Sequence, residues 1–173
     1  MSETRKYYGK YRGTVLNNVD PMKMGRLMLS VPDVSGLSPT SWALPCVPVL
    51  GLQMGIFAVP QLGSGVWVEF EQGDPDYPIW TGCFAGSAAD IPVAAQPIVP
   101  PISGIVLQTT LLNSLVVSDL PPTPVTGGIV LQSMTGAMIV VNDSGIYISN
   151  GKGAAITMVG PTVTINNGAL VVV

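Results

Sequence analysis

Short runs of alternating apolar and polar residues follow one another through the first half of the chain. They are separated by Gly, Pro, Asn and Asp, which favour turns. The runs are 7–19, 25–31, 41–47, 65–71 and 77–84. In the clearest, 65–71, the residues Val66, Val68 and Phe70 share one face. Five short strands without a convincing helix predict a small all-β barrel. We expect the Gly-rich segment 50–59 to be a connection packed on its core.

The last 70 residues repeat with an offset of 24 positions. Residues 104–109 align with 128–133, and residues 115–119 align with 139–143, with the Pro-rich segment 121–124 between the copies. Shorter alternating runs follow at 145–150, 155–159, 162–166 and 169–173. Short strands at near-regular spacing are typical of a β-helix or β-prism. One such strand layer buries nothing alone, so it needs neighbouring coils or neighbouring chains.

Between these two regions lies an Ala/Pro-rich segment, residues 87–103. Its four prolines favour an extended, fairly stiff linker. The sequence therefore predicts three parts, with a barrel over 1–86, a linker over 87–103 and a β-helical region over 104–173.

Charge is scarce. Asp, Glu, Lys and Arg make up 10% of the 173 residues and apolar residues 47%, whereas soluble domains carry about 25% charged residues. Residues 91–173 contain only Asp119, Asp143 and Lys152 as charged residues. The uncharged stretches 102–118 and 154–173 contain polar and β-branched residues, which disfavour a membrane-spanning helix. We explain the scarcity of charged residues instead by a surface of Ser, Thr, Asn and Gln around an apolar core.

The absence of histidine excludes Ser-His-Asp and Cys-His catalysis and histidine-ligated metal sites. We therefore expect no enzyme activity, no cofactor and no metal. A pI near 4.6 argues against nucleic acid as a partner. Cys46 and Cys83 lie in apolar strand-like segments, which favours two reduced, buried thiols over a disulfide.

Several motifs occur in a characteristic order. The longest is 65–82, in which GVWVEFE is followed by QGDPDYP and then IWTG. Supporting pieces are YGKYRGTV at 8–15, GRL at 25–27, and Trp42-Ala43 with Pro45. Together they resemble the five-stranded oligonucleotide-binding-fold (OB-fold) barrel of contractile-tail spike proteins, which include the phage baseplate assembly protein V family and the VgrG spikes of type VI secretion. The resemblance continues through the linker into the C-terminal region.

The resemblance implies a homotrimer. Three barrels would form a collar that caps the tail tube, and three C-terminal segments would wind into an intertwined β-helix that helps pierce the target cell envelope. Tube and hub proteins would adjoin the barrels, and a PAAR-like tip protein would cover the apolar end formed by Leu170, Val171, Val172 and Val173. The expected location is the virion, after assembly in the host cytoplasm. Without histidine, the histidine-ligated iron tip of some phage spikes is not expected.

Two polar clusters admit alternatives. Gly73, Asp74, Pro75, Asp76 and Pro78 favour a tight turn over a metal or acid–base site. Nearby, Glu69 and Glu71 are expected to be solvated or paired with a basic residue of a neighbouring subunit. The basic residues near the start are candidates for hub or subunit contact, or for nucleic-acid contact: Arg5, Lys6, Lys10 and Arg12.

The alternative function is a soluble binding module whose OB-type barrel binds single-stranded nucleic acid or another ligand. The sequence leaves open whether the chain serves a phage tail, a tailocin or a secretion system.

Overall fold

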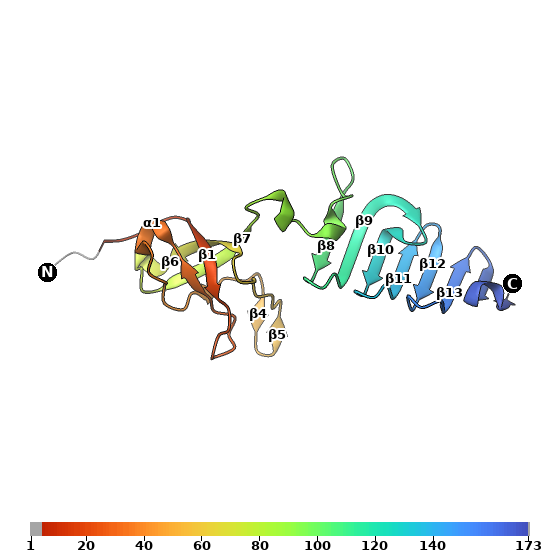
Figure 1. Ribbon diagram of the computed structural model, residues 1–173, viewed down its shortest axis with the longest axis horizontal. Helices are drawn as coiled ribbons and strands as arrows, with labels where there is room; N and C mark the ends of the chain where they lie inside the picture. Colours follow the sequence, from red (N-terminus) through yellow and green to blue (C-terminus); the bar gives the residue numbers. More distant parts are fainter. Residues whose placement is uncertain (1–4, 173) are drawn as a thin grey trace. The chain divides into compact units, whose positions relative to one another are not determined.

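A computed structural model describes residues 5–172 and divides the chain into two compact units, with the boundary between Gly86 and Ser87. Both units are built from strands (Figure 1). The α-helix α1 (Pro32–Ser35) is one turn long. Within residues 5–172, no helix is long and apolar enough to span a membrane. Each unit has its own hydrophobic core.

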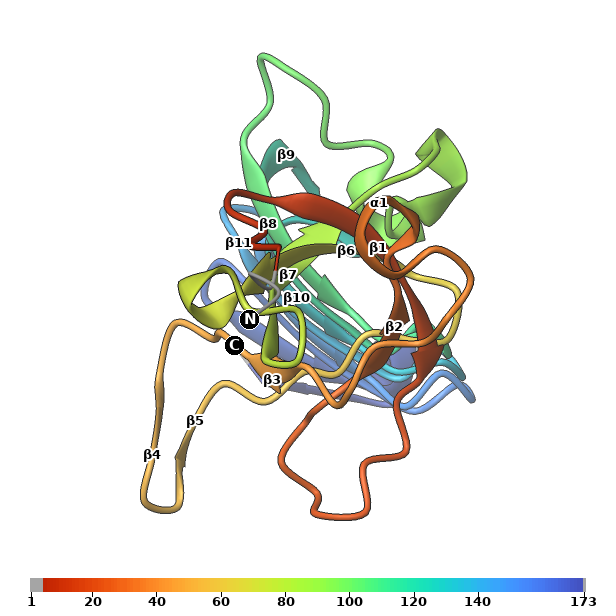
Figure 2. The same ribbon diagram turned by 90° about the vertical axis from the view of Figure 1, so that its left-hand side faces the viewer.

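The first unit is a closed sheet. Its strands are β1 (Tyr11–Asn17), β2 (Met28–Ser30), β3 (Leu44–Pro45), β6 (Gly65–Phe70) and β7 (Pro78–Phe84), in the order β2-β1-β6-β7-β3. Backbone bridges Leu27–Ala43 and Ser30–Pro39 join the two ends of this order. The sheet therefore curls into a barrel, as the view in Figure 2 shows, in agreement with the strand pattern.

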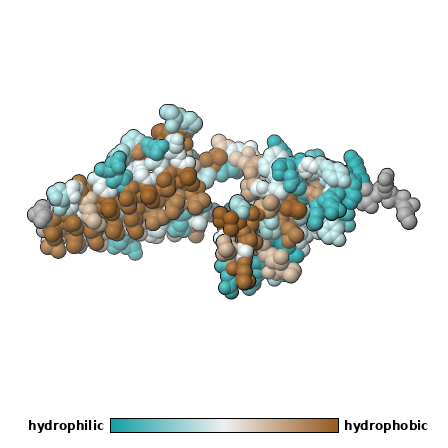
Figure 3. All heavy atoms as spheres, turned by 180° about the vertical axis from the view of Figure 1, so that it is seen from behind, coloured by the Kyte–Doolittle hydropathy of each residue, from teal (hydrophilic) through white to brown (hydrophobic). Residues whose placement is uncertain are grey.

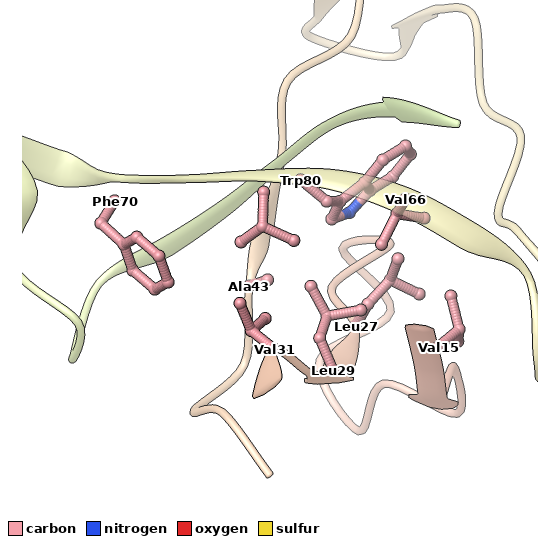
Figure 4. Packing of buried hydrophobic residues seen from close by; sticks show 9 residues of the cluster. Val15, Leu27, Leu29, Val31, Ala43, Val66, Phe70 and Trp80 are labelled. Atoms are coloured by element: carbon pink, nitrogen blue, oxygen red, sulfur yellow. The ribbon is translucent and has the colours of Figure 1, made fainter. Parts of the chain in front are cut away.

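The barrel interior is filled by side chains from every wall (Figure 4). Val66, Val68 and Phe70 of β6 point inward, as their alternation predicts. They pack with Val15, Leu27, Leu29, Val31, Ala43 and Trp80. The indole N–H of Trp80 donates to the carbonyl of Gly25 at 3.1 Å, so the only polar atom of that side chain is satisfied while its ring is buried.

The segment 50–59 departs from its prediction. It contains a hairpin, β4 (Leu50–Gly51) paired with β5 (Met54–Gly55), instead of a connection packed on the core. Most of its apolar side chains are exposed, most of all Leu52 at the tip, whereas Val59 is half-buried and packs on the barrel core. Cys46 and Cys83 are also exposed as free thiols, so the expectation of burial was wrong. Apolar character alone did not reveal that these residues lie outside the barrel.

The second unit is one eight-stranded antiparallel sheet in which each strand pairs with its neighbours in sequence (Figure 1). The strands are β8 (Gly104–Gln108), β9 (Ser114–Thr123), β10 (Thr126–Gln132), β11 (Met138–Asn142), β12 (Gly145–Ser149), β13 (Ala155–Val159), β14 (Thr162–Ile165) and β15 (Leu170–Val172). A short 3-10 turn, η4 (Asn166–Gly168), precedes β15. A single chain thus forms a meander and does not by itself form a β-helix.

The 24-residue repeat pairs within the chain. Its first copy gives β8 and β9, its second gives β10 and β11, and β9 lies between β8 and β10. The prolines expected to separate the copies are part of β9, which extends through Pro121 and Pro122. They are accommodated because the ladder shifts register near Gly127 and Gly128, which interrupts regular pairing there.

The segment 87–103 is not an extended linker throughout. It contains two 3-10 turns, η2 (Ala88–Asp90) and η3 (Val93–Ala95). Ala94 and Ile98 pack on the core of the second unit, and the backbone N–H of Ala94 donates to the side chain of Gln108 at 2.9 Å. Apolar residues among the prolines therefore let this segment cover part of the sheet.

Candidate functional site

Two rows of aliphatic side chains cross all eight strands on one face of the second unit. The register aligns Ile105, Val117, Ile129, Val141, Ile146, Met158, Val163 and Val172 in the first row. It aligns Leu107, Leu115, Leu131, Ile139, Ile148, Ile156, Ile165 and Leu170 in the second row. We call these sixteen positions the apolar face.

The apolar face lies open in the single chain. Twelve of its side chains are exposed, from 36% for Ile146 to 65% for Ile105 and Leu107, and the rest are half-buried. Figure 3 shows it as a continuous hydrophobic surface along the strands. A contiguous apolar surface of this kind marks an interaction site, since soluble monomers rarely expose one. The sixteen positions include no charged or polar residue.

The opposite face of the same sheet is different. Its central row begins with four valines, Val106, Val116, Val130 and Val140, and Val140 is fully buried. Ala94 and Ile98 cover these valines. The row then continues as Tyr147, Thr157 and Thr164, which bring hydroxyl groups to this face. The chain thus covers the valines of the first four strands on this face itself, whereas it leaves the apolar face open.

Two family models match the chain. The phage baseplate V C-terminal trimerisation domain matches residues 104–171, a range that contains seven of the eight strands and most of β15. The type VI secretion system/phage-baseplate injector OB domain matches residues 11–84, from β1 to β7. The chain belongs to the phage baseplate V family. None of the curated proteins compared with it matches.

Membership of the baseplate V family gives the chain a structural role in a phage baseplate or a related secretion spike, and it assigns self-association to the C-terminal unit. Both matched models describe structural baseplate domains rather than enzymes. The trimerisation match coincides with the sheet that carries the apolar face.

The predicted turn motif connects β6 to β7. The 3-10 turn η1 (Glu71–Gly73) leads into Asp74, whose carboxylate accepts from the backbone N–H of Asp76 at 3.1 Å and from Lys6 Nζ at 3.3 Å. The first bond and then Lys6 lower the pKa of Asp74 below its ordinary value. Gly73 has a φ of +75° and packs under the Tyr8 ring, where a Cβ would lie 3.0 Å from it. Pro78 is buried opposite Phe70.

The four basic candidates near the start have partners within their own unit. Lys10 Nζ lies 2.9 Å from Glu69 Oε1, and Lys6 pairs with Asp74. Arg5 lies over the Tyr7 ring, and Arg12 lies over Trp67 and Phe84. Glu69 therefore finds its basic partner in the same chain, which differs from the expected solvent or neighbouring subunit. All four basic residues remain exposed.

The predicted tip-binding end coincides with β15, the last strand of the sheet. Leu170 and Val172 are the final members of the two apolar rows, and each is more than half exposed. The side chain of Val171 and the whole of Val173 lie outside the described residues.

The sequence predicted that this strand layer needs neighbouring coils or neighbouring chains to bury its apolar residues. Of the sixteen positions, however, it singled out only Leu170 and Val172 as contacts for a partner. The signal was present, because every strand carries apolar residues two positions apart, as in Ile105/Leu107 and Ile146/Ile148. Only the register showed that these pairs align into uninterrupted rows.

Proposed function

We propose that three copies of this chain assemble through the apolar face into the central spike of a contractile injection machine. Three such sheets around a threefold axis would bury both aliphatic rows from β8 to β14 in a shared, uncharged core and form the needle, with the β15 layer at the end of that core. The observation that supports this arrangement is the unbroken apolar face within the matched trimerisation domain. The three meanders would together provide the intertwined β-helical shaft that one chain does not form.

The mechanical role follows from this assembly. Antiparallel pairing from β8 to β15 ties each strand of the shaft to the next, which resists deformation along the sheet. We propose that the OB units cap the tail tube and that contraction of the sheath drives the needle through the target cell envelope. The working location is the virion, after assembly in the bacterial host cytoplasm.

The partners at the two ends have different chemistry. Arg5, Lys6, Lys10 and Arg12 remain exposed and would face hub or tube proteins or a neighbouring OB unit. At the other end, Leu170 and Val172 leave an apolar surface on β15 that suits a PAAR-like tip protein.

The trimer is tested by a matched pair of substitutions on β10. Leu131 belongs to the apolar face, and Gln132 next to it lies on the opposite face; both are exposed in the single chain. A buried leucine contributes about 2 kcal/mol. Three copies of Leu131→Glu should therefore cost at least about 6 kcal/mol, or about four orders of magnitude in the trimer dissociation constant. Gln132→Glu should leave the trimer intact.

Light scattering or sedimentation gives the mass of the unmodified chain and both variants. We expect trimers for the unmodified chain and Gln132→Glu, with little change between low and high NaCl, because the proposed contact surface contains no charges. A monomeric unmodified chain, or equal behaviour of the two variants, would refute the proposed assembly.

A further inference from the structure

The first unit also exposes apolar residues that its barrel does not use. They gather on the β4–β5 hairpin and the residues after it: Leu50, Leu52, Met54, Ile56 and Phe57. Leu52 at the tip is 95% exposed. Figure 2 shows the hairpin projecting from the barrel, and Figure 3 shows its hydrophobic surface. No charged residue occurs anywhere between 34 and 68.

An apolar groove of about 640 Å³ opens beside the base of this hairpin. Its lining includes Cys46, Val47, Ala58, Val59, Trp80 and Cys83. Backbone hydrogen bonds hold this wall together, because β3 pairs with β7 and the backbone N–H of Cys46 donates to the carbonyl of Trp80 at 2.9 Å. The groove and the hairpin tip thus share the same apolar, uncharged character.

The hairpin projects from the barrel at its tip, while its base stays close to the barrel: Ile56 lines the groove, and Phe57 packs against Gly25. The backbone N–H of Ile56 donates to the carbonyl of Val49 at 3.0 Å, which closes the base of the loop. Gly55 fits there because a Cβ would lie 2.6 Å from the same carbonyl oxygen. A knob and a groove at different places on one surface suit head-to-tail contact between copies, which closes into a ring when the rotation is right.

We propose that the hairpin of each protomer inserts Leu52 into the groove of the next, linking the three OB units into a ring. This inference rests on the proposed trimer, which would hold the three OB units at an effective concentration of the order of millimolar. A modest contact between them is then sufficient. Matching two uncharged surfaces also avoids the cost of burying charges.

Native cysteines allow a direct test in the full-length chain. Cys46 and Cys83 are free and line the groove, so a cysteine at position 52 should reach one of them in the adjacent protomer. Leu52→Cys should fold normally because the side chain is exposed. After mild oxidation, we expect covalent dimers and trimers on a non-reducing denaturing gel, at least about tenfold above the control.

The matched control is Leu37→Cys, since Leu37 is fully exposed in the same unit but does not line the groove. It should give no more cross-linking than the unmodified chain. Leu52→Cys combined with Cys46→Ser and Cys83→Ser should also lose the cross-link. If the cross-link persists without the two native cysteines, the hairpin tips meet one another, which overturns the proposed contact.

The mass of the untreated Leu52→Cys protein separates the two proposals. A trimer without the hairpin-to-groove cross-link overturns the ring, while the spike proposal stands. A monomer overturns both.

Discussion

A single buried carboxylate shapes the loop between β1 and β2. Asp20 Oδ1 accepts from Arg26 Nη2 at 2.7 Å, from Arg26 Nε at 3.1 Å and from the backbone N–H of Met22 at 2.9 Å. Asp20 Oδ2 accepts from the backbone N–H of Met24 at 2.8 Å. Arg26 and then the backbone donors hold the pKa of Asp20 far below its ordinary value. Residue chemistry therefore fixes a loop that contains no regular element.

The low pKa of Asp20 makes its contribution to stability depend on pH. Folding favours the carboxylate, so its contribution is complete above the unfolded pKa of about 3.9 and is lost as pH falls below it. We expect Asp20→Asn to lower the melting temperature of the first unit at pH 7, and the difference from the unmodified chain to shrink below about pH 4.

Tryptophan fluorescence is the suitable measurement, because Trp42, Trp67 and Trp80 all lie in the first unit. Asp33→Asn, at an exposed position in α1, is the control and should change the melting temperature little at either pH. A pH-independent effect of Asp20→Asn would show that the carboxylate charge is not what stabilises the loop.

At the scale of elements, the corner where β9 turns into β10 is formed by residues from β9, β10 and β11. Gly127 and Gly128 have φ values of +75° and +67°, where the register shifts. The Asn142 amide donates to the carbonyls of Thr123 at 2.7 Å and Thr126 at 2.9 Å, which ties this corner to β11. This corner thus combines a local glycine pair with one side chain from a later strand.

Gly128→Ala should therefore disrupt the sheet. The new Cβ would overlap the carbonyl oxygen of Val141, in addition to the strain of a positive φ. Gly136→Ala is the matched control, because Gly136 also has a positive φ but a Cβ at that position would meet no heavy atom of the described residues within 4 Å. We expect about 1–2 kcal/mol of destabilisation for Gly136→Ala and clearly more for Gly128→Ala.

Circular dichroism melting at strand wavelengths compares the two alanine variants. Equal melting temperatures would mean that the corner between β9 and β10 relaxes freely, contrary to the close packing around Gly128.

At the scale of the whole molecule, the apolar face spans eight strands while the proposed tip contact uses only the last one. Charges introduced into the last layer should therefore spare the trimer and abolish binding of a PAAR-like protein from the same genome. We expect this result for Leu170→Asp combined with Val172→Asp. The same charges at Ile146 and Ile148, in the middle of both rows, should dissociate the trimer.

Sedimentation gives the assembly state, and a binding assay with the purified PAAR-like protein gives the tip contact. Unchanged binding by the Leu170→Asp/Val172→Asp trimer would contradict the proposed role of β15.

Much of the fold could be predicted because strand alternation is a local property. The residues on the inner face of β6, the strands of the second unit and the motif around Asp74 were all visible in the sequence. The hairpin 50–55 was misjudged because an exposed apolar loop and a buried one have the same composition. The partner of Glu69 was missed because Lys10 lies 59 positions away in sequence.

For the apolar face, too, one part could be predicted from the sequence and another part could not. Alternation with period two put Ile105 and Leu107, or Ile146 and Ile148, on a common face of their strands, and this information is local. Tertiary structure decided which face stays open, because Ala94 and Ile98 cover the valines on the other side. It also aligned eight separate pairs into two rows, since register depends on turns and bulges as well as on side-chain pattern. The sequence alone established a charge-poor, alternating β-region that resembles spike proteins, and long-range packing aligned its apolar residues into the one continuous surface that we propose for self-association.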